Sequence, residues 1–107
     1  MQWSFQTFGP VVDDEIRSLP ADMQARLLRF AELIVQSGFH ALPRDSVKHL
    51  EGKLWELRVS GRDGIARAVY ITATMRRVVV LRVFIKKTQR TPPRELEIAR
   101  QRAKEVR

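Results

Sequence analysis

Three strand-like segments in the second half of the chain carry arginine or lysine inside otherwise apolar runs. They span residues 54–59, 65–72 and 76–87, and the turn-rich sequence SGRDG separates the first two. Short apolar runs joined by turns are typical of an antiparallel meander. Because a charged side chain in a strand must face water or an anion, these segments constrain both the fold and the kind of partner that the fold can bind.

Alternation of side chains along these segments predicts a sheet with two different faces. Successive residues of a strand point to opposite faces. In the first segment, one face receives Trp55, Leu57 and Val59, and the other receives Glu56 and Arg58. The third segment divides in the same way, into the set Val79, Leu81, Val83 and Ile85 and the set Arg82, Phe84 and Lys86. We therefore expect one face to pack the core and the other to form a cationic surface.

The positive charge of the chain is concentrated in this half. Residues 1–47 hold 4 Lys/Arg and 6 Asp/Glu, a balance of −2, whereas residues 48–107 hold 16 and 6, a balance of +10, which together give the net charge of +8. Cations that contact phosphates release condensed counterions, so this asymmetry favours a polyanionic partner. Nucleic acid is the leading candidate, and an acidic protein that masks the surface satisfies the same electrostatics.

Length and composition limit the remaining possibilities. A chain of 107 residues with 44% apolar content supports a single domain at residues 1–107. The chain has no cysteine and only two histidines, which excludes disulfides, thiolate metal sites and an all-protein zinc site, and we expect no cofactor. No apolar run approaches a membrane span, and no signal-peptide pattern is visible, so we expect a cytoplasmic protein that does not bind membranes.

The first half of the chain predicts a short strand and a helical hairpin. Trp3 and Phe5 alternate with polar residues, as in a strand. Residues 11–19 suit a first helix, and Pro20 begins a second, whose apolar stripe continues until Gly38. We expect this pair of helices to cover one face of the sheet.

The rest of the pattern completes an α+β fold in the order β-α-α-β-β-β-α. Residues 39–53 show no period and are expected to form a loop. Thr91 is expected to cap a final helix, whose narrow apolar stripe suggests loose docking.

Conventional catalytic motifs are missing, and the arginines and lysines suit RNA cleavage better. That reaction needs the 2′-hydroxyl deprotonated, the charge of the phosphorane neutralised and the leaving 5′-oxygen protonated. Arginine offers a fixed donor fork to phosphate oxygens, and a lysine beside other cations can have a lowered pKa. The alternative, which composition favours, is that the cations form only a solvated surface. For His40 and His49 an ordinary polar role is favoured, although His49 is also a candidate base.

Three sequence elements, taken in order, resemble the RelE/HigB-like toxins of bacterial type II toxin–antitoxin systems, in particular the phage-derived HigB-like branch. They are K-x-L-x-G-x-LWELR at residues 48–58, R-x-x-Y at residues 67–70, and F-x-KK-T-x-[KR]-TP at residues 84–92. The resemblance implies a RelE-like, microbial-RNase-like fold with an antiparallel sheet. It also implies an mRNA interferase, an endoribonuclease that acts on messages in the ribosomal A site, and a helix-turn-helix, HigA-like antitoxin as the partner.

The same resemblance implies roles for individual residues. It implies Arg67 as a phosphate-binding arginine and Lys86 and Lys87 as a cationic pair, and with Arg58 these are the candidate catalytic residues. Candidate RNA-binding residues are Lys48, His49, Lys53, Arg82, Phe84 and Arg90. Arg82 and Arg90 depart from the family pattern, which leaves the general base and acid unassigned. Tyr70, three residues from Arg67, is expected on the opposite sheet face in the core, as is Trp55 in its own strand.

Two functions therefore remain open from the sequence. The first is a ribonuclease toxin. The second is a non-catalytic basic module that binds nucleic acid or only its antitoxin.

Overall fold

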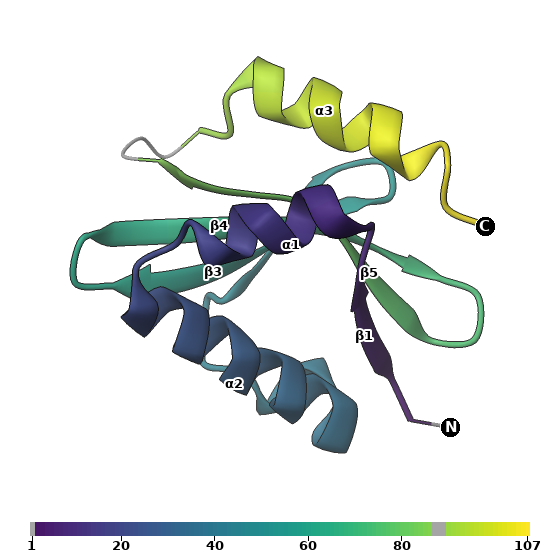
Figure 1. Ribbon diagram of the computed structural model, residues 1–107. Helices are drawn as coiled ribbons and strands as arrows, with labels where there is room; N and C mark the ends of the chain where they lie inside the picture. The colour runs from purple at the N-terminus through teal and green to yellow at the C-terminus, as the bar shows by residue number, and fades with distance from the viewer. Residues whose placement is uncertain (1, 87–89) are drawn as a thin grey trace.

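The computed structural model (Figure 1) describes residues 2–86 and 90–107, and for Lys86 it describes the backbone alone. The fold is α+β, as predicted, with a five-stranded sheet and three α-helices. The elements in chain order are β1 (Ser4–Thr7), α1 (Pro10–Arg17), α2 (Ala21–Ser37), the short 3-10 helix η1 (Phe39–Ala41), β2 (Val47–Glu51), β3 (Leu54–Gly61), β4 (Gly64–Ala73), β5 (Arg77–Lys86) and α3 (Pro93–Ala103).

The sheet has the strand order β1-β5-β4-β3-β2. Strands β2 to β5 form an antiparallel meander, which confirms the prediction for the second half of the chain. Strand β1 pairs with β5 in the parallel direction, from Ser4 opposite Arg77 to Thr7 opposite Val80, so the complete sheet is mixed. The helical hairpin separates β1 from the meander in the sequence, and β1 pairs with β5 at the edge of the meander.

One strand was missed by the sequence pattern. Residues 39–53, predicted as a loop, contain η1 and the edge strand β2. In β2, Lys48 lies opposite Glu56 and His49 lies opposite Trp55, and Gly52 turns the chain with φ at +48°. Because β2 is an edge strand with exposed Lys48 and His49, it lacks the apolar alternation by which a strand is recognised.

The helical hairpin forms as predicted. Pro10 occupies the first turn of α1, and Gly38, with φ at +94°, follows the last residue of α2. The apolar stripe of α2 is buried against the sheet at Met23, Leu27, Phe30 and Ile34.

The two faces of the sheet carry two separate cores. Helices α1 and α2 cover one face, and α3 covers the other (Figure 1). The first core includes Leu57 and Tyr70, and the second includes Val69 and Leu81 with Ala99 of α3. The expectation of one apolar face and one cationic surface is therefore wrong, because α3 closes the second face over a further apolar layer.

A β-bulge in β5 changes which residues share a face. The register with β4 shifts between Val69, opposite Arg82, and Tyr70, opposite Val80. Val79 and Leu81 consequently face α3, whereas Val83 joins the core under the helical hairpin. The predicted set of Val79, Leu81, Val83 and Ile85 on one face is wrong at Val83, because simple alternation assumes a strand without a bulge.

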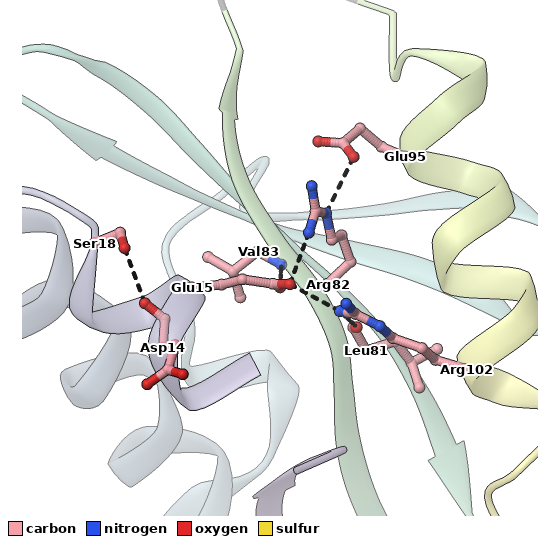
Figure 2. Close-up of polar contacts among 8 residues, drawn as sticks. All are labelled: Asp14, Glu15, Ser18, Leu81, Arg82, Val83, Glu95 and Arg102. Atoms are coloured by element: carbon pink, nitrogen blue, oxygen red, sulfur yellow. Dashed lines mark hydrogen bonds and ion pairs between the residues drawn. The ribbon is translucent and has the colours of Figure 1, made fainter. Parts of the chain in front are cut away.

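The bulge also places Arg82 within a cluster of charges around Glu15 of α1 (Figure 2). The Glu15 carboxylate accepts hydrogen bonds from the Val83 backbone N–H (2.9 Å), from Arg82 Nη1 (2.7 Å) and from Arg102 Nη1 of α3 (2.9 Å). Arg82 Nε reaches Glu95 of α3 at 3.0 Å. These contacts link α1, β5 and α3, so α3 is held more firmly than its narrow apolar stripe predicted.

We expect Glu15→Ala to lower the free energy of unfolding by about 2 kcal/mol, because it removes one acceptor from each of two partly buried guanidinium groups and leaves the Val83 backbone N–H without its acceptor. The matched control is Glu32→Ala on α2, an exposed glutamate without a contact of this kind. Urea denaturation of both variants measures the difference. Equal stabilities of the two variants would show that the Glu15 cluster contributes nothing net.

Candidate functional site

Arg67, the predicted phosphate-binding residue, lies in β4 at the centre of the sheet, opposite Arg58 of β3 and Phe84 of β5. Its side chain is buried, with 2% of its surface exposed, and its Nη1 donates to Oε1 of the fully buried Glu56 at 2.9 Å. Thr91, just before α3, donates its hydroxyl to Oε2 of the same carboxylate at 3.1 Å. The predicted surface position of Arg67 is therefore wrong, and its role in catalysis stays a prediction.

The Glu56 carboxylate neutralises Arg67 but does not use all its donors. The Arg67 Nε–H is buried and has no acceptor among the residues that the structure describes. A buried donor without a partner costs about 1–3 kcal/mol, so the site is polar and incompletely satisfied. The Arg67 Nε–H can therefore donate to an additional anionic oxygen without the loss of an existing hydrogen bond.

Thr91, two residues before α3, contacts this ion pair. Thr91 was predicted to cap α3, but the residue at the N-cap position is Pro92, and the Thr91 hydroxyl bonds to Glu56 instead. Phe84 is partly buried and packs against the core on this face, as does Leu96 of α3. Because Arg67 is buried as well, a ligand does not reach it from solvent in this conformation.

Arg58 is in a more open position than Arg67. It is half-buried and lines a pocket of about 290 Å³ at the edge of the sheet, which we call the arginine pocket. The lining of the arginine pocket includes Arg26 and Phe30 of α2, Arg44 and Asp45 of the following loop, Arg58 of β3 and Ile65 of β4. Sequence reasoning selected Arg58 but gave no signal for Arg26 or Arg44, which belong to a helix surface and a loop.

Some of the remaining predicted RNA-binding residues are exposed, and others form contacts within the protein. Lys48 and Lys53 are exposed on and beside β2. His49 Nε2 lies 2.8 Å from the Gly52 carbonyl oxygen, and its ring contacts the Trp55 ring edge-on, so it also stabilises the β2–β3 turn. Arg82 is held by Glu15 and Glu95. Burial lowers the pKa of Arg82 and its hydrogen bonds to Glu95 and Glu15 raise it, with a net increase.

The end of β5 is only partly within the described residues. Lys86 is the last residue of β5 and its backbone lies opposite Ile65, while its side chain lies outside the description. Lys87 lies outside the described residues altogether. Arg90 is exposed. The predicted roles of these three residues stay predictions.

Two residues near Arg67 were missed by sequence reasoning, Glu56 and Thr91. Alternation placed Glu56 correctly on the face that also carries Arg67, but its function as the partner of Arg67 depends on the register between β3 and β4.

Trp55 was predicted to be core, but 38% of its surface is exposed. It lies beyond the cover of α2 and lines an aromatic pocket of about 310 Å³ together with Trp3, Phe39 and Tyr70.

No metal site or membrane helix emerges from the described residues. Within residues 2–86 and 90–107, no group of three or more His, Cys, Asp or Glu side chains is arranged to hold a metal ion. None of the helices in that part of the chain has both the length and the apolar character that crossing a membrane requires.

Comparison with known proteins gives the family. The model of the family described as Phage derived protein Gp49-like matches residues 14–104. The chain belongs to this family. Among curated proteins, no sequence matches the chain.

Solved structures show how this Gp49-like chain folds. A double mutant of the Escherichia coli toxin RelE in the free state is similar at 17% identity and a TM-score of 0.60, with 99% of each chain covered. RelE of the archaeal RelE–RelB complex from Pyrococcus horikoshii is similar at 20% identity and a TM-score of 0.53, covering 79% of this chain and 96% of that one. The predicted RelE-like fold is confirmed.

We expect Glu56→Ala to lower the free energy of unfolding by about 3–5 kcal/mol, because it leaves the buried Arg67 charge without its carboxylate. Glu56→Leu combined with Arg67→Met should recover most of this loss, since apolar groups of similar volume then replace the whole pair. Chemical denaturation of the single and double variants gives the coupling. A double variant as unstable as Glu56→Ala would show that packing, rather than the buried charge, dominates.

Tyr70 offers a pH test of the core. Burial raises the pKa of its hydroxyl above the ordinary value. In the unfolded chain this hydroxyl ionises near pH 10, so we expect stability to be fully retained below that pH and to fall as pH rises above it. Tyr70 is the only tyrosine, so phenolate absorbance reports on it alone. Phenolate that appears near pH 10 while the protein stays folded would contradict this burial effect.

Proposed function

We propose that the chain is the toxin of a type II toxin–antitoxin system and acts as an endoribonuclease on mRNA. The observation that carries this proposal is the cross-strand pair of Arg58 and Arg67 on a RelE-like sheet. Side chains of directly opposed residues start about 5 Å apart at their Cβ atoms, so two guanidinium groups can reach one phosphate. Membership of the Gp49-like family and the sequence resemblance to RelE/HigB-like toxins support the same function.

The chemistry follows from what two arginines can do at a phosphodiester. The 2′-hydroxyl of the RNA gives its proton to a base as its oxygen attacks phosphorus, the bond to the 5′-oxygen breaks, and the 5′-oxygen takes up a proton from an acid. The products carry a 2′,3′-cyclic phosphate and a 5′-hydroxyl. Charge builds on the non-bridging oxygens in the transition state, and preorganised donors aimed at them lower the barrier. Arg58 and Arg67 supply these donors, and Lys86 and Lys87 are the further cations proposed near the reacting phosphate.

The Glu56 carboxylate is the anion that lies beside Arg67 in the structure. Its two oxygens already accept from Arg67 Nη1 and the Thr91 hydroxyl. RNA must therefore enter with a shift of the Thr91 segment, after which the free Arg67 Nε–H and the neighbouring Arg58 face the phosphate. Glu56 is a positioning residue in this scheme, since it keeps the Arg67 fork oriented.

The proposed partners follow from the family and the charge. A net charge of +8 favours rapid association with anionic chains, including mRNA on the ribosome and an acidic segment of an antitoxin. One of the similar structures is a RelE–RelB complex. We propose a cognate antitoxin, of the helix-turn-helix, HigA-like type, as the protein partner.

A second function has one observation in its favour. Arg67 is buried and neutralised, which is the arrangement expected of a structural residue. In that case the chain binds nucleic acid or its antitoxin through exposed cations and has no catalytic activity.

Growth and transcript cleavage on induced expression distinguish the two functions. We expect the chain to arrest growth and cut mRNA within coding regions, and Arg58→Ala to reduce single-turnover cleavage by 100-fold or more, as loss of one transition-state donor typically does. The control is Arg62→Ala, an exposed arginine on the turn between β3 and β4. Intact transcripts in cells that express the folded wild-type chain would support the non-catalytic function.

A further inference from the structure

We infer that the arginine pocket is a second phosphate-binding subsite, in which Arg26 and Arg44 hold the RNA backbone next to the phosphate at Arg58 and Arg67. This inference rests on the proposed function, because it takes RNA to be the ligand. It assigns RNA-positioning roles to two arginines that lie outside the strands and outside the sequence motifs.

Three separate segments each contribute an arginine to the lining of this pocket. Arg26 comes from the exposed surface of α2, Arg44 from the loop before β2, and Arg58 from β3. The buried Phe30 and the partly buried Ile65 form an apolar wall of the same pocket. An apolar wall excludes water and strengthens the interaction of nearby cations with an anion.

The described residues do not neutralise the charge of the pocket. No carboxylate among the described residues forms an ion pair with Arg26, Arg44 or Arg58. Asp45 lines the same pocket but lies outside ion-pairing distance of all three, so the walls carry three positive charges and one negative charge. Like charges that converge on one pocket repel, and a bound phosphate removes that cost.

Other arginines of the chain show that carboxylates are available to the fold. Arg82 and Arg102 share Glu15, Arg100 pairs with Glu51 and Glu97, and Arg67 pairs with Glu56. Those pairs lie between β5 and α3, around α3 or inside the sheet. Among the arginines outside these ion pairs, Arg26, Arg44 and Arg58 line one pocket, which is the arrangement expected where cations serve a ligand rather than the fold.

The loop that carries Arg44 is anchored to the strand that carries Arg58. The Pro43 carbonyl accepts from the Ser46 N–H at 3.3 Å, which closes a turn with Asp45 at a positive φ of +66°. The Ser46 carbonyl in turn accepts from the Arg58 N–H at 2.8 Å. A type II turn requires positive φ at its third residue. This turn therefore fixes the position of the Arg44 backbone relative to Arg58.

RNA fits these features better than an acidic protein segment does. Three arginines that line one pocket offer donors for the several oxygens of one phosphate group. The pocket also shares Arg58 with the proposed cleavage site, and Arg58 lies directly across from Arg67 in the sheet. Consecutive phosphates of one strand can thus occupy the two positions.

The test compares Arg26→Ala with Arg29→Ala. Both arginines are exposed residues of α2, one turn apart, and only Arg26 lines the pocket. The probe is a short single-stranded RNA with 2′-deoxy nucleotides that prevent cleavage, and its Kd is measured over a series of salt concentrations. We expect Arg26→Ala and Arg44→Ala each to weaken binding about tenfold and to reduce the salt slope by about 0.7, the value for one phosphate contact on a single strand. Arg29→Ala should change neither.

The outcomes separate this inference from the proposed function. Wild-type cleavage of all-ribose RNA, with equal Kd values for Arg26→Ala and Arg29→Ala, would overturn the subsite and leave the endoribonuclease standing. Specific weakening by Arg26→Ala with no wild-type cleavage would support the subsite and overturn the endoribonuclease. Unchanged RNA binding with weakened antitoxin binding would show a protein-docking surface instead and overturn the subsite. Arg26→Lys, which keeps the charge, should recover the salt slope if the contact is to phosphate.

Discussion

The packing of one face of the sheet depends on the ion pair between Arg67 and Glu56. A guanidinium group at the sheet centre is stable only with a carboxylate beside it, and Glu56 on the adjacent strand supplies one with no exposed surface of its own. The second Glu56 oxygen needs a donor, and Thr91 provides it from the chain that leads into α3. Closure of this face by α3 therefore depends on a charge in the sheet as well as on apolar packing.

Charges also complete the edge of β5 where β1 stops pairing. The last hydrogen bond of that parallel pair joins the Phe8 N–H to the Val80 carbonyl. Beyond it, Glu15 accepts from the Val83 N–H and Arg102 donates to the Leu81 carbonyl, so side chains replace the missing strand. The bulge at this point turns Arg82 toward both helices. Helix α3 has few buried apolar residues, and these contacts explain how it nevertheless stays docked.

Local patterns predicted the elements well, and long-range pairing decided what they could not predict. The spacing of Met23, Leu27, Phe30 and Ile34 was sufficient to predict α2. Alternation also placed Tyr70 correctly, on the face of the sheet away from Arg67. Strand β2 was missed because an exposed edge strand needs no apolar face. The cationic surface was overestimated because the partners of its arginines are distant in sequence: Glu15 is 67 residues from Arg82, and Thr91 is 35 residues from Glu56.

The same distances explain why residue type alone does not separate structural from functional arginines. Arg82 and Arg58 both interrupt apolar strands, yet Arg82 lies between two carboxylates and Arg58 faces a pocket with two further arginines. A cation held by two carboxylates, as Arg82 is, gains little from a phosphate, since binding must first break an existing pair, whereas Arg67 keeps a free Nε–H beside its single carboxylate. An unpaired cation releases counterions when it binds and so contributes directly to affinity. The arginines that we propose for RNA binding are therefore those without a carboxylate partner that line one pocket, at the edge formed by α2, the loop before β2 and β3.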